Sequence, residues 1–223
     1  MCGRFTIAVN KEDLKEHLYR QFGIEDFEVD IFLPRYNVAP GEKIIAVISD
    51  GKNFRAGLMR WGFVPSFSSG FEIINARRET LSEKPSFKNS FRNKRCLILA
   101  DGYYEWKKEG KQKLPYRIAL KDRKLFSFAG IWNWAELSGE RVPTCAIITC
   151  EAGSELRKIH GRVPIVLEQE AERLWLTQQN PEALLALTEP LDESKFHAHR
   201  VSTFVNNSRN DSEECILPIE NER

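Results

Sequence analysis

Short apolar runs bounded by turn residues make up most of this chain, and they predict β-strands. The runs are rich in β-branched and aromatic residues, which favour extended backbone on a half-buried sheet surface. The predicted strands cover residues 43–49, 54–61, 95–100, 116–120, 125–132, 144–149, 163–167 and 196–202. The charged sequence ALKDRKLF joins two of these runs and predicts a hairpin over residues 119–126.

Helical patterns are fewer than strand patterns. Asn10 is a suitable N-cap for a helix over residues 11–22, which has Leu14, Leu18 and Phe22 on one face and Gly23 as its stop. Shorter helical patterns cover residues 77–83, 152–159, 168–176 and 181–187. Because strands outnumber helices and do not alternate with them regularly, we expect an α+β fold with a mainly antiparallel, barrel-like core and peripheral helices.

Length and composition favour a single domain over residues 1–223. The chain is 42% hydrophobic, enough for a substantial core, and it lacks a Pro/Gly/Ser-rich linker, a fixed-period repeat or a low-complexity tract. It also lacks a signal-peptide pattern and any run of about 18 apolar residues. We therefore expect a cytoplasmic protein with no membrane segment.

The five cysteines argue against a disulfide framework and against a zinc ribbon, because their number is odd and they form no C-x-x-C pair. Cys96, Cys145 and Cys150 lie in apolar runs, where we expect them to be buried and reduced. No metal site and no cofactor is predicted.

Charge is balanced overall but uneven along the chain. The net charge of +1 does not indicate a protein that is basic overall, as many nucleic-acid-binding domains are. Residues 76–95 nevertheless carry seven positive side chains against two acidic ones, whereas residues 166–193 carry seven acidic side chains against one arginine. Such a distribution is compatible with a polyanion held on one side, or with ordinary solvated helix faces.

Polar residues embedded in apolar runs are the candidates for chemistry, since burying them unpaired is costly. Cys2 opens the chain in MCGRF, Asn75 ends an apolar stretch, Glu105 lies between two aromatic residues, and His160 precedes an apolar strand. The aromatic setting is expected to raise the pKa of Glu105 toward neutrality. The structural alternatives are that Asn75 caps a helix, Glu105 is a paired core carboxylate and His160 meets a neighbouring carbonyl.

Seven sequence blocks together resemble one known family. MCGRF, RYNVAP, MRWGFVPSF, INARRET, ADGYYEWKK, IHGRVPIVL and VSTFVNN occur in this order across nearly the whole chain. The same blocks characterise the SOS response-associated peptidase family, also called abasic-site processing proteins. The resemblance implies a compact α+β domain with a basic groove for single-stranded DNA, in which an exposed Cys2 couples covalently to an abasic site.

The resemblance also assigns roles to matching positions. Cys2 is the implied nucleophile, Asn75 orients it or the sugar, and Glu105 and His160 assist proton transfer. The implied DNA-binding residues are phosphate-contacting arginines together with groove-lining residues, namely Arg4, Arg77, Arg162, Asn37, Pro40, Phe67, Trp106 and Thr149.

Two positions depart from the family pattern. Gly161 stands where the family usually has an acidic residue, and without that carboxylate we expect His160 to titrate lower. Phe67 and Ser68 replace a position that is often rich in tryptophan, which predicts weaker base stacking.

The implied chemistry requires that Met1 is removed. Cys2 would then carry both an α-amine, with a reference pKa of about 7.7–8.0, and a thiol. The amine can form an imine with the aldehyde of an abasic sugar, and the thiol can close it to a thiazolidine. We therefore expect abasic single-stranded DNA as the partner of a monomeric protein, with little sequence preference and strong salt dependence.

Two other functions fit the same residues. A cysteine peptidase would use Cys2, His160 and Asn75, with the Met1–Cys2 bond or its own DNA-linked Cys2 as substrate. A non-covalent single-strand binder would use the basic segment over residues 76–95.

Overall fold

Strands dominate the computed structural model, which describes residues 2–28, 30–67 and 71–219. Within those ranges the strands are β1 (Phe5–Ile7), β2 (Arg35–Val38), β3 (Lys43–Ser49), β4 (Phe54–Trp61), β5 (Asn75–Arg77), β6 (Arg95–Ala100), β7 (Gly102–Glu109), β8 (Gln112–Leu120), β9 (Phe126–Leu137), β10 (Glu140–Glu151), β11 (Arg162–Pro164) and β12 (Phe196–Arg200). The α-helices are α1 (Lys11–Phe22), α2 (Pro85–Asn93), α3 (Gln169–Thr177) and α4 (Pro181–Ala186). The 3₁₀ turns are η1 (Arg78–Thr80), η2 (Leu156–Lys158), η3 (Glu193–Lys195), η4 (Thr203–Asn206) and η5 (Glu213–Cys215).

Five strands close into a barrel in the order β10-β4-β3-β6-β9, because β9 pairs back onto β10. The pairings are antiparallel except for β10 with β4, which is parallel. Strands β5 and β11 add to β10 outside this ring. The predicted α+β fold with a mainly antiparallel, barrel-like core and peripheral helices is therefore confirmed.

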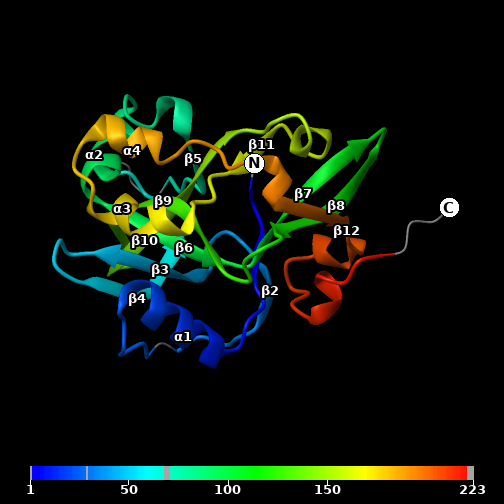
Figure 1. The fold of residues 1–223 in the computed structure, drawn as a ribbon, viewed down its shortest axis with the longest axis horizontal. Coiled ribbons are helices and arrows are strands. Elements are labelled where there is room, and N and C mark those ends of the chain that lie inside the picture. The colour runs from blue at the N-terminus through cyan, green and yellow to red at the C-terminus, as the bar shows by residue number, and fades with distance from the viewer. Residues whose placement is uncertain (1, 29, 68–70, 220–223) are drawn as a thin grey trace.

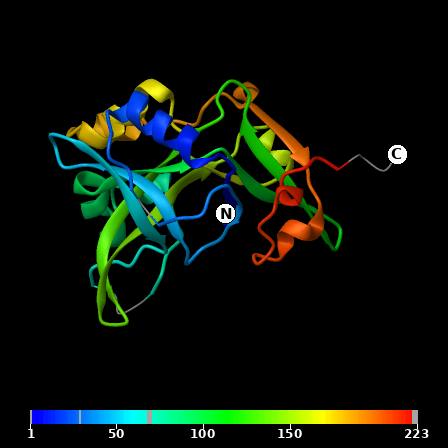
Figure 2. The ribbon, with the colours of Figure 1, turned by 90° about the horizontal axis from the view of Figure 1, so that it is seen from below.

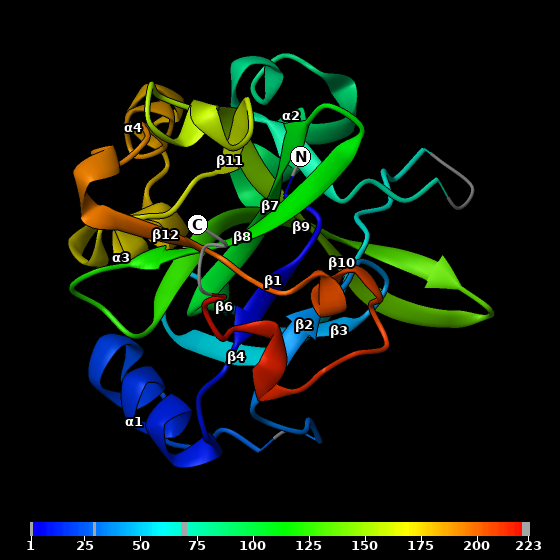
Figure 3. The ribbon, with the colours of Figure 1, turned by 90° about the vertical axis from the view of Figure 1, so that its right-hand side faces the viewer.

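The remaining strands form an open antiparallel sheet in the order β12-β8-β7-β1-β2. Figure 1 shows β1, in blue, running through the middle of the molecule, with the barrel on one side and the β7–β8 hairpin on the other. Figure 3 shows β1 crossing in front of the barrel strands. The open sheet therefore carries the first residues of the chain along the barrel.

Aromatic packing joins the two sheets. The ring of Phe5 lies 5.2 Å from Trp61 and 5.8 Å from Phe128 between centroids, and Tyr103 lies 6.0 Å from Phe128. All four side chains are buried. Large buried aromatic rings in these tilted arrangements contribute strongly to a core, so β1 and β7 are firmly attached to the barrel.

Helix α1 has the predicted bounds and caps. Asn10 Oδ1 accepts a hydrogen bond from the Asp13 backbone N–H at 2.7 Å, and Gly23 ends the helix at φ +69°. Figure 2 shows α1 and α3 on the same side of the barrel, where Gln21 and Gln169 hydrogen-bond to each other.

The predicted hairpin over residues 119–126 is wrong. Strand β8 pairs with β7 and β12 in the open sheet, whereas β9 pairs with β6 and β10 in the barrel, so the charged segment is a crossing between sheets. Hairpins are instead formed by β3–β4, which turns at Gly51 (φ +91°), by β7–β8, which turns at Gly110 (φ +59°), and by β9–β10, which turns at Ser138 and Gly139 (φ +53° and +83°). Left-handed backbone at these turns is what glycine permits.

Two predicted helices shrink to single 3₁₀ turns, and one helix was missed. The 77–83 pattern contains only η1, and the 152–159 pattern contains only η2. Helix α2 escaped notice because its N-cap, Lys84, makes no side-chain cap and its buried aromatic face consists of just Phe87 and Phe91.

All five cysteines are buried and in the reduced form, as predicted for Cys96, Cys145 and Cys150. No helix in the described ranges is long and apolar enough to cross a bilayer. Among the same residues, no group of three or more His, Cys, Asp or Glu side chains is placed to hold a metal ion.

Candidate functional site

The pairing of β1 with β7 brings Cys2 beside Glu105. Phe5 is the register partner of Tyr103, and the Tyr104 backbone N–H donates to the Arg4 carbonyl at 2.9 Å, so the ladder continues toward the start of the chain. Cys2 is fully buried. Burial raises the pKa of its thiol well above the ordinary range, and the neighbouring Glu105 charge adds to that rise.

Glu105 and His160 form the electrostatic centre of the site. Glu105 Oε2 lies 3.5 Å from His160 Nδ1, although Glu105 is on β7 and His160 is in the segment before β11. Burial raises the pKa of Glu105 to about 7, and it lowers the pKa of His160. Near neutral pH the carboxyl therefore exchanges its proton readily while the imidazole stays mostly neutral.

Strand β10 organises the polar residues that flank this pair. Asn75 and Arg77 on β5 are the register partners of Ile147 and Thr149. On the other edge of β10, Glu151 is opposite Arg162 of β11. Strand β10 therefore has the Asn75 segment along one edge and the segment that follows His160 along the other.

Arg162 is held within this framework. Its guanidinium donates to both carboxylate oxygens of Glu79 at 3.0 Å, to the Thr149 carbonyl at 2.8 Å and to Thr149 Oγ1 at 3.3 Å. The Arg162 backbone N–H lies 3.1 Å from His160 Nδ1 as a donor. Arg162 therefore positions the imidazole as well as lining the site.

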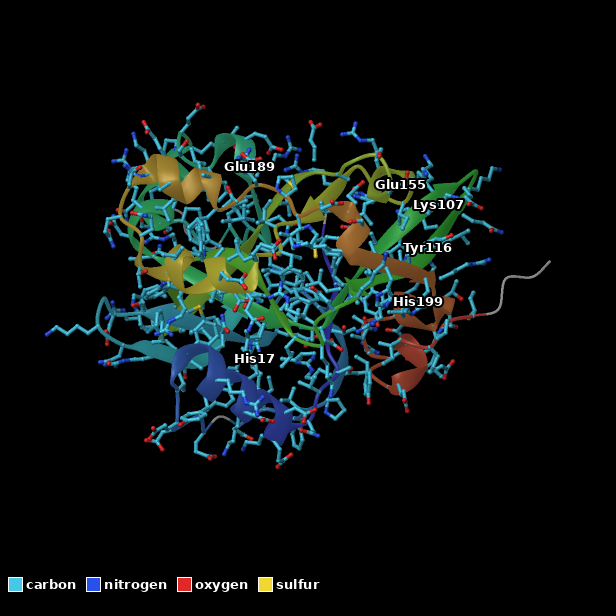
Figure 4. The ribbon with its side chains drawn as sticks, in the orientation of Figure 1. His17, Lys107, Tyr116, Glu155, Glu189 and His199 are labelled. Carbon is cyan, nitrogen blue, oxygen red and sulfur yellow. The ribbon has the colours of Figure 1, made fainter. Side chains whose placement is uncertain are left out.

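A cleft of about 720 Å³ opens beside Glu105 and His160. Its walls are the β7–β8 hairpin and the segment that precedes β11. The lining residues are Glu105, Trp106, Lys107, Lys108, Lys113, Arg157, Lys158, Ile159, His160, Gly161 and Asn206. Figure 4 shows Lys107 and Tyr116 on this hairpin, across the molecule from His17 and Glu189.

Comparison with known proteins identifies the family. A sequence model of the SOS response associated peptidase (SRAP) family matches residues 1–208. The chain is 42% identical to abasic site processing protein YoqW of Bacillus subtilis, over 97% of this chain and 99% of that protein. It is 33% identical to abasic site processing protein YedK of Escherichia coli, over 98% of this chain and all of that protein. The chain belongs to the SRAP family.

A solved structure supports the same assignment for the fold. A crystal structure of a protein from Bacteroides thetaiotaomicron superposes with a TM-score of 0.84 at 26% identity, covering 98% of this chain and all of that one. The resemblance read from the seven sequence blocks is therefore confirmed at the level of family and fold.

Two expectations about the SRAP site change with the structure. The resemblance implied an exposed Cys2, but Cys2 has no exposed surface because it packs into the core that β1 shares with the barrel. Asn75 lies in β5 and Arg77 is the N-cap of η1, so the helix-cap alternative for Asn75 is wrong. Asn75 Nδ2 donates to the Ile74 carbonyl at 3.0 Å, and its buried Oδ1 accepts no hydrogen bond from the described residues.

The predicted DNA-binding residues fall into two groups, of which the first is built into the fold. Asn37 is fully buried, and its Nδ2 donates to the carbonyls of Val205, Asn207 and Asn210. Arg4 Nη1 donates to Asn37 Oδ1 at 2.6 Å, and Thr149 is 1% exposed beneath Arg162. In this structure these side chains hydrogen-bond within the protein and so support the site structurally.

The second group is open to solvent. Pro40, Phe67 and Arg77 are exposed, and no ion pair joins Arg77 to any residue within the described ranges. Trp106 is half-buried, with its Nε1 donating to Asn206 Oδ1 at 2.7 Å. Ser68, named with Phe67 as a family departure, lies outside the described residues, as does Met1.

The other family departure, Gly161, leaves room in the cleft. A Cβ added at Gly161 would meet no atom within 4 Å. The pKa of His160 is lowered mainly by burial, so the effect of the missing carboxylate at position 161 stays a prediction. His160 Nδ1 also lies 3.0 Å from the Arg162 carbonyl oxygen, and it donates there only in the tautomer in which it does not accept from the Arg162 backbone N–H.

Sequence reasoning missed the cationic walls of the cleft. Lys107, Lys108 and Lys113 follow Glu105 along the hairpin, and Arg157 and Lys158 precede His160. The available signal was local: EWKKEGKQK and LRKIH each place lysine or arginine within a few residues of a candidate catalytic side chain. By contrast, the basic 76–95 segment is partly neutralised, because its Arg78 pairs with Glu189.

Proposed function

We propose that this SRAP protein forms a covalent thiazolidine crosslink with abasic sites in single-stranded DNA, through Cys2 after removal of Met1. The observation that carries the proposal is the placement of Cys2 next to the Glu105–His160 pair at the end of a cationic cleft. The names of the relatives, abasic site processing proteins, support the same lesion as substrate. The crosslink would shield the lesion in a DNA-damage response.

The chemistry needs two nucleophiles on one residue. The α-amine of Cys2 adds to the open-chain aldehyde of the sugar, and the carbinolamine loses water to give an imine. The thiol then adds across the C=N bond, so sulfur binds the carbon and the nitrogen gains a proton. Ring closure is intramolecular and benefits from a high effective molarity, so the thiazolidine outlasts the imine.

Glu105 and His160 supply the proton transfers of these steps. A carboxyl with a pKa of about 7 can donate to the departing hydroxyl of the carbinolamine. The thiol pKa is raised, so sulfur adds as a thiol whose proton must be accepted, a task that we assign to neutral His160. Asn75 Oδ1, which accepts no hydrogen bond from the part of the chain that the structure describes, is available to orient the amine or the sugar.

Arg77 and the cleft cations would hold the DNA through phosphates. Such contacts carry no base information, so little sequence preference and a strong salt dependence follow. We place the reaction in the cytoplasm, at the nucleoid when damaged DNA is bound, and assign it to a monomer. Because Cys2 is buried here, removal of Met1 must also give the sugar access to Cys2.

An autopeptidase remains the second function to test. The same three groups, Cys2, His160 and Asn75, would hydrolyse the Met1–Cys2 bond or release a linked Cys2. The raised thiol pKa reduces the thiolate that such a peptidase needs. The crosslinking function is therefore the stronger proposal.

The test combines N-terminal mass with crosslinking. Protein whose mass shows loss of Met1 is mixed with an abasic single-stranded oligonucleotide, and a heat-stable band on a denaturing gel is expected. Cys2→Ala keeps the α-amine but not the thiol, so only a labile, borohydride-trappable imine should remain. The matched control is Cys150→Ala, another buried cysteine, which should crosslink like the parent.

Other outcomes decide against the proposal. A parent protein without Met1 that gives no heat-stable band excludes the covalent function and leaves non-covalent binding. A Cys2→Ala protein that crosslinks as stably as the parent excludes the thiol. For the autopeptidase, a His160→Ala protein that still loses Met1 in the absence of any aminopeptidase would exclude His160 as its base.

A further inference from the structure

The cleft beside Glu105 and His160 has cations on both walls. The β7–β8 hairpin contributes Lys107, Lys108 and Lys113, and the segment that contains η2 contributes Arg157 and Lys158. The only carboxylate among its lining residues is the buried Glu105 at the inner end. Its potential therefore favours an anion along the outer part, away from the candidate catalytic pair.

Lys108 and Lys113 form an unfavourable pair in the hairpin. They are direct register partners on antiparallel strands, so their side chains leave the sheet on the same face. Like charges directly opposite each other destabilise a ladder. No ion pair joins either lysine to an acidic side chain within the described ranges, whereas Lys107 one position earlier pairs with Glu109 at 2.5 Å.

The cations of the facing wall make only weak ion pairs, although Arg157 also donates two hydrogen bonds to the Ala152 carbonyl. Arg157 pairs with Glu151, and Lys158 pairs with Glu155, and more than half of each side chain is exposed. Exposed pairs of this kind contribute little free energy. A phosphate entering the cleft can therefore replace these carboxylates at small cost.

We propose that Lys108 and Lys113, with Arg157 and Lys158 facing them, hold the backbone phosphates of the DNA strand next to the abasic site, on one side of it only. The inference rests on the proposed function for the position of the lesion. Glu105 and Lys108 are three residues apart on β7, or about 10 Å at strand rise. A DNA strand that leaves the lesion along the cleft would therefore bring the phosphates nearest the abasic sugar within reach of these cations.

Reversible binding tests the phosphate contacts apart from the chemistry. The probe is a single-stranded oligonucleotide with a reduced abasic sugar, which has no aldehyde and cannot form an imine. The variant is K108Q/K113Q. The control is K43Q/K52Q, which removes two exposed lysines from the β3–β4 hairpin, whose turn lies at the opposite end of the molecule from the β7–β8 tip (Figure 1).

Salt dependence is the expected readout. A single-strand contact contributes about 0.7 to the slope of log affinity against log salt. K108Q/K113Q should flatten that slope by about 1.4 if each lysine neutralises one phosphate, and K43Q/K52Q should leave it unchanged. Slopes that agree for parent and K108Q/K113Q, with both proteins folded by circular dichroism, would overturn the inference.

Truncated probes test whether the contact is local. Removing all nucleotides on one side of the abasic sugar should abolish the difference between K108Q/K113Q and the parent, and removing the other side should preserve it. If K108Q/K113Q and the parent still differ with both truncated probes, the lysines attract DNA through their charge at any position. The proposal of phosphate contacts on one side of the lesion is then wrong. The crosslinking gel judges the proposed function separately, since these binding measurements need no covalent step.

Discussion

Two buried glutamates have the same electrostatic character and different surroundings. Glu105 is 2% exposed and Glu172 is fully buried, and burial raises the pKa of each to about 7. Glu105 lines the cleft, 3.5 Å from His160 and beside Cys2. Glu172 lies on the inner face of α3, where Arg123 Nη1 is 3.7 Å from its Oε1.

The difference shows that a perturbed carboxyl becomes a candidate catalyst only through its neighbours. Arg123, Ser127 and Gln21 all act to lower the pKa of Glu172, but they offset only part of the cost of burial. They are packing partners, and none is a thiol or an imidazole. Perturbed pKa values mark functional sites with some probability; here the cleft, His160 and Cys2 separate one carboxyl from the other.

Neutralising each carboxyl gives the largest expected contrast. Glu105→Gln should slow crosslinking to abasic single-stranded DNA by about 10² to 10⁴-fold, the usual contribution of a positioned proton donor. Glu172→Gln should stay within about twofold of the parent, because Glu172 is remote from the cleft. Initial rates from quenched denaturing gels measure both.

A different ranking would break the comparison. Equal losses in both variants would mean that a buried carboxyl matters for the fold alone, and circular dichroism would then show the same structural change in both. Normal crosslinking by folded Glu105→Gln would remove Glu105 from the mechanism.

The second prediction concerns stability, where Glu172 should dominate. Between pH 4.5 and 7 folded Glu172 keeps a proton that the unfolded chain has released, so its burial costs more as the pH rises. Glu172→Gln should therefore match the parent near pH 4.5 and exceed its free energy of unfolding by about 3 kcal/mol at pH 8. Urea denaturation measures both values.

Glu170→Gln is the matched control, since Glu170 is an exposed residue of the same helix. It should leave the free energy of unfolding nearly unchanged at either pH. If Glu172→Gln gains nothing at pH 8, the carboxyl is stabilised by its neighbours more strongly than its burial suggests, and the electrostatic equivalence with Glu105 fails.

The fold was readable from the sequence where local signals agreed. Helix α1 has an N-cap at Asn10 and a left-handed Gly23, and strands β3, β4 and β6 have their predicted bounds because each is a short run of apolar residues. The hairpin at 119–126 failed because turn chemistry cannot say whether two strands join the same sheet. That choice depends on long-range packing, such as the contact of β9 with β6.

The sequence predicted individual residues of the site but not how those residues lie relative to one another. Glu105 and His160 stood out as polar residues in apolar settings, but their 3.5 Å separation arises because the fold brings β7 of the open sheet next to the segment before β11. Thr149 was predicted to bind DNA and yet is buried, because the fold uses it to hold Arg162. The Lys108–Lys113 pair was invisible because it requires the register of β7 with β8.

The third prediction separates the two carboxyls by pH. The neutral α-amine increases up to its pKa of about 7.7–8.0, and protonated Glu105 decreases above its pKa of about 7. The rate of borohydride-trapped imine formation should therefore be bell-shaped, with its maximum between pH 7 and 8 and an alkaline limb that falls up to tenfold per unit. Glu105→Gln should lose the alkaline limb, and Glu172→Gln should keep it.

An alkaline limb that persists in Glu105→Gln would assign the falling limb to another group and contradict the role of Glu105 as proton donor. A profile without any alkaline limb in the parent would do the same. Trapping the imine keeps the thiol step out of the measured rate.

The smallest expected effect tests the hairpin wall of the cleft. Lys108→Glu replaces a like-charged cross-strand pair with an attractive one opposite Lys113, so the free energy of unfolding should rise by about 0.5 kcal/mol at low salt. Added salt should reduce that gain. Lys52→Glu, in the turn between β3 and β4, is the control and should change stability less.

The same Lys108→Glu variant should bind the reduced abasic oligonucleotide more weakly than the parent. If the Lys108–Lys113 repulsion serves to bind an anion, removing it should raise stability and lower affinity together. A destabilising pair that bound no ligand would bring the protein no benefit. If Lys108→Glu is more stable and binds the oligonucleotide equally well, the repulsion has no role in binding. The β7–β8 wall would then differ from the Glu172 region in its charge but not by a role in binding DNA.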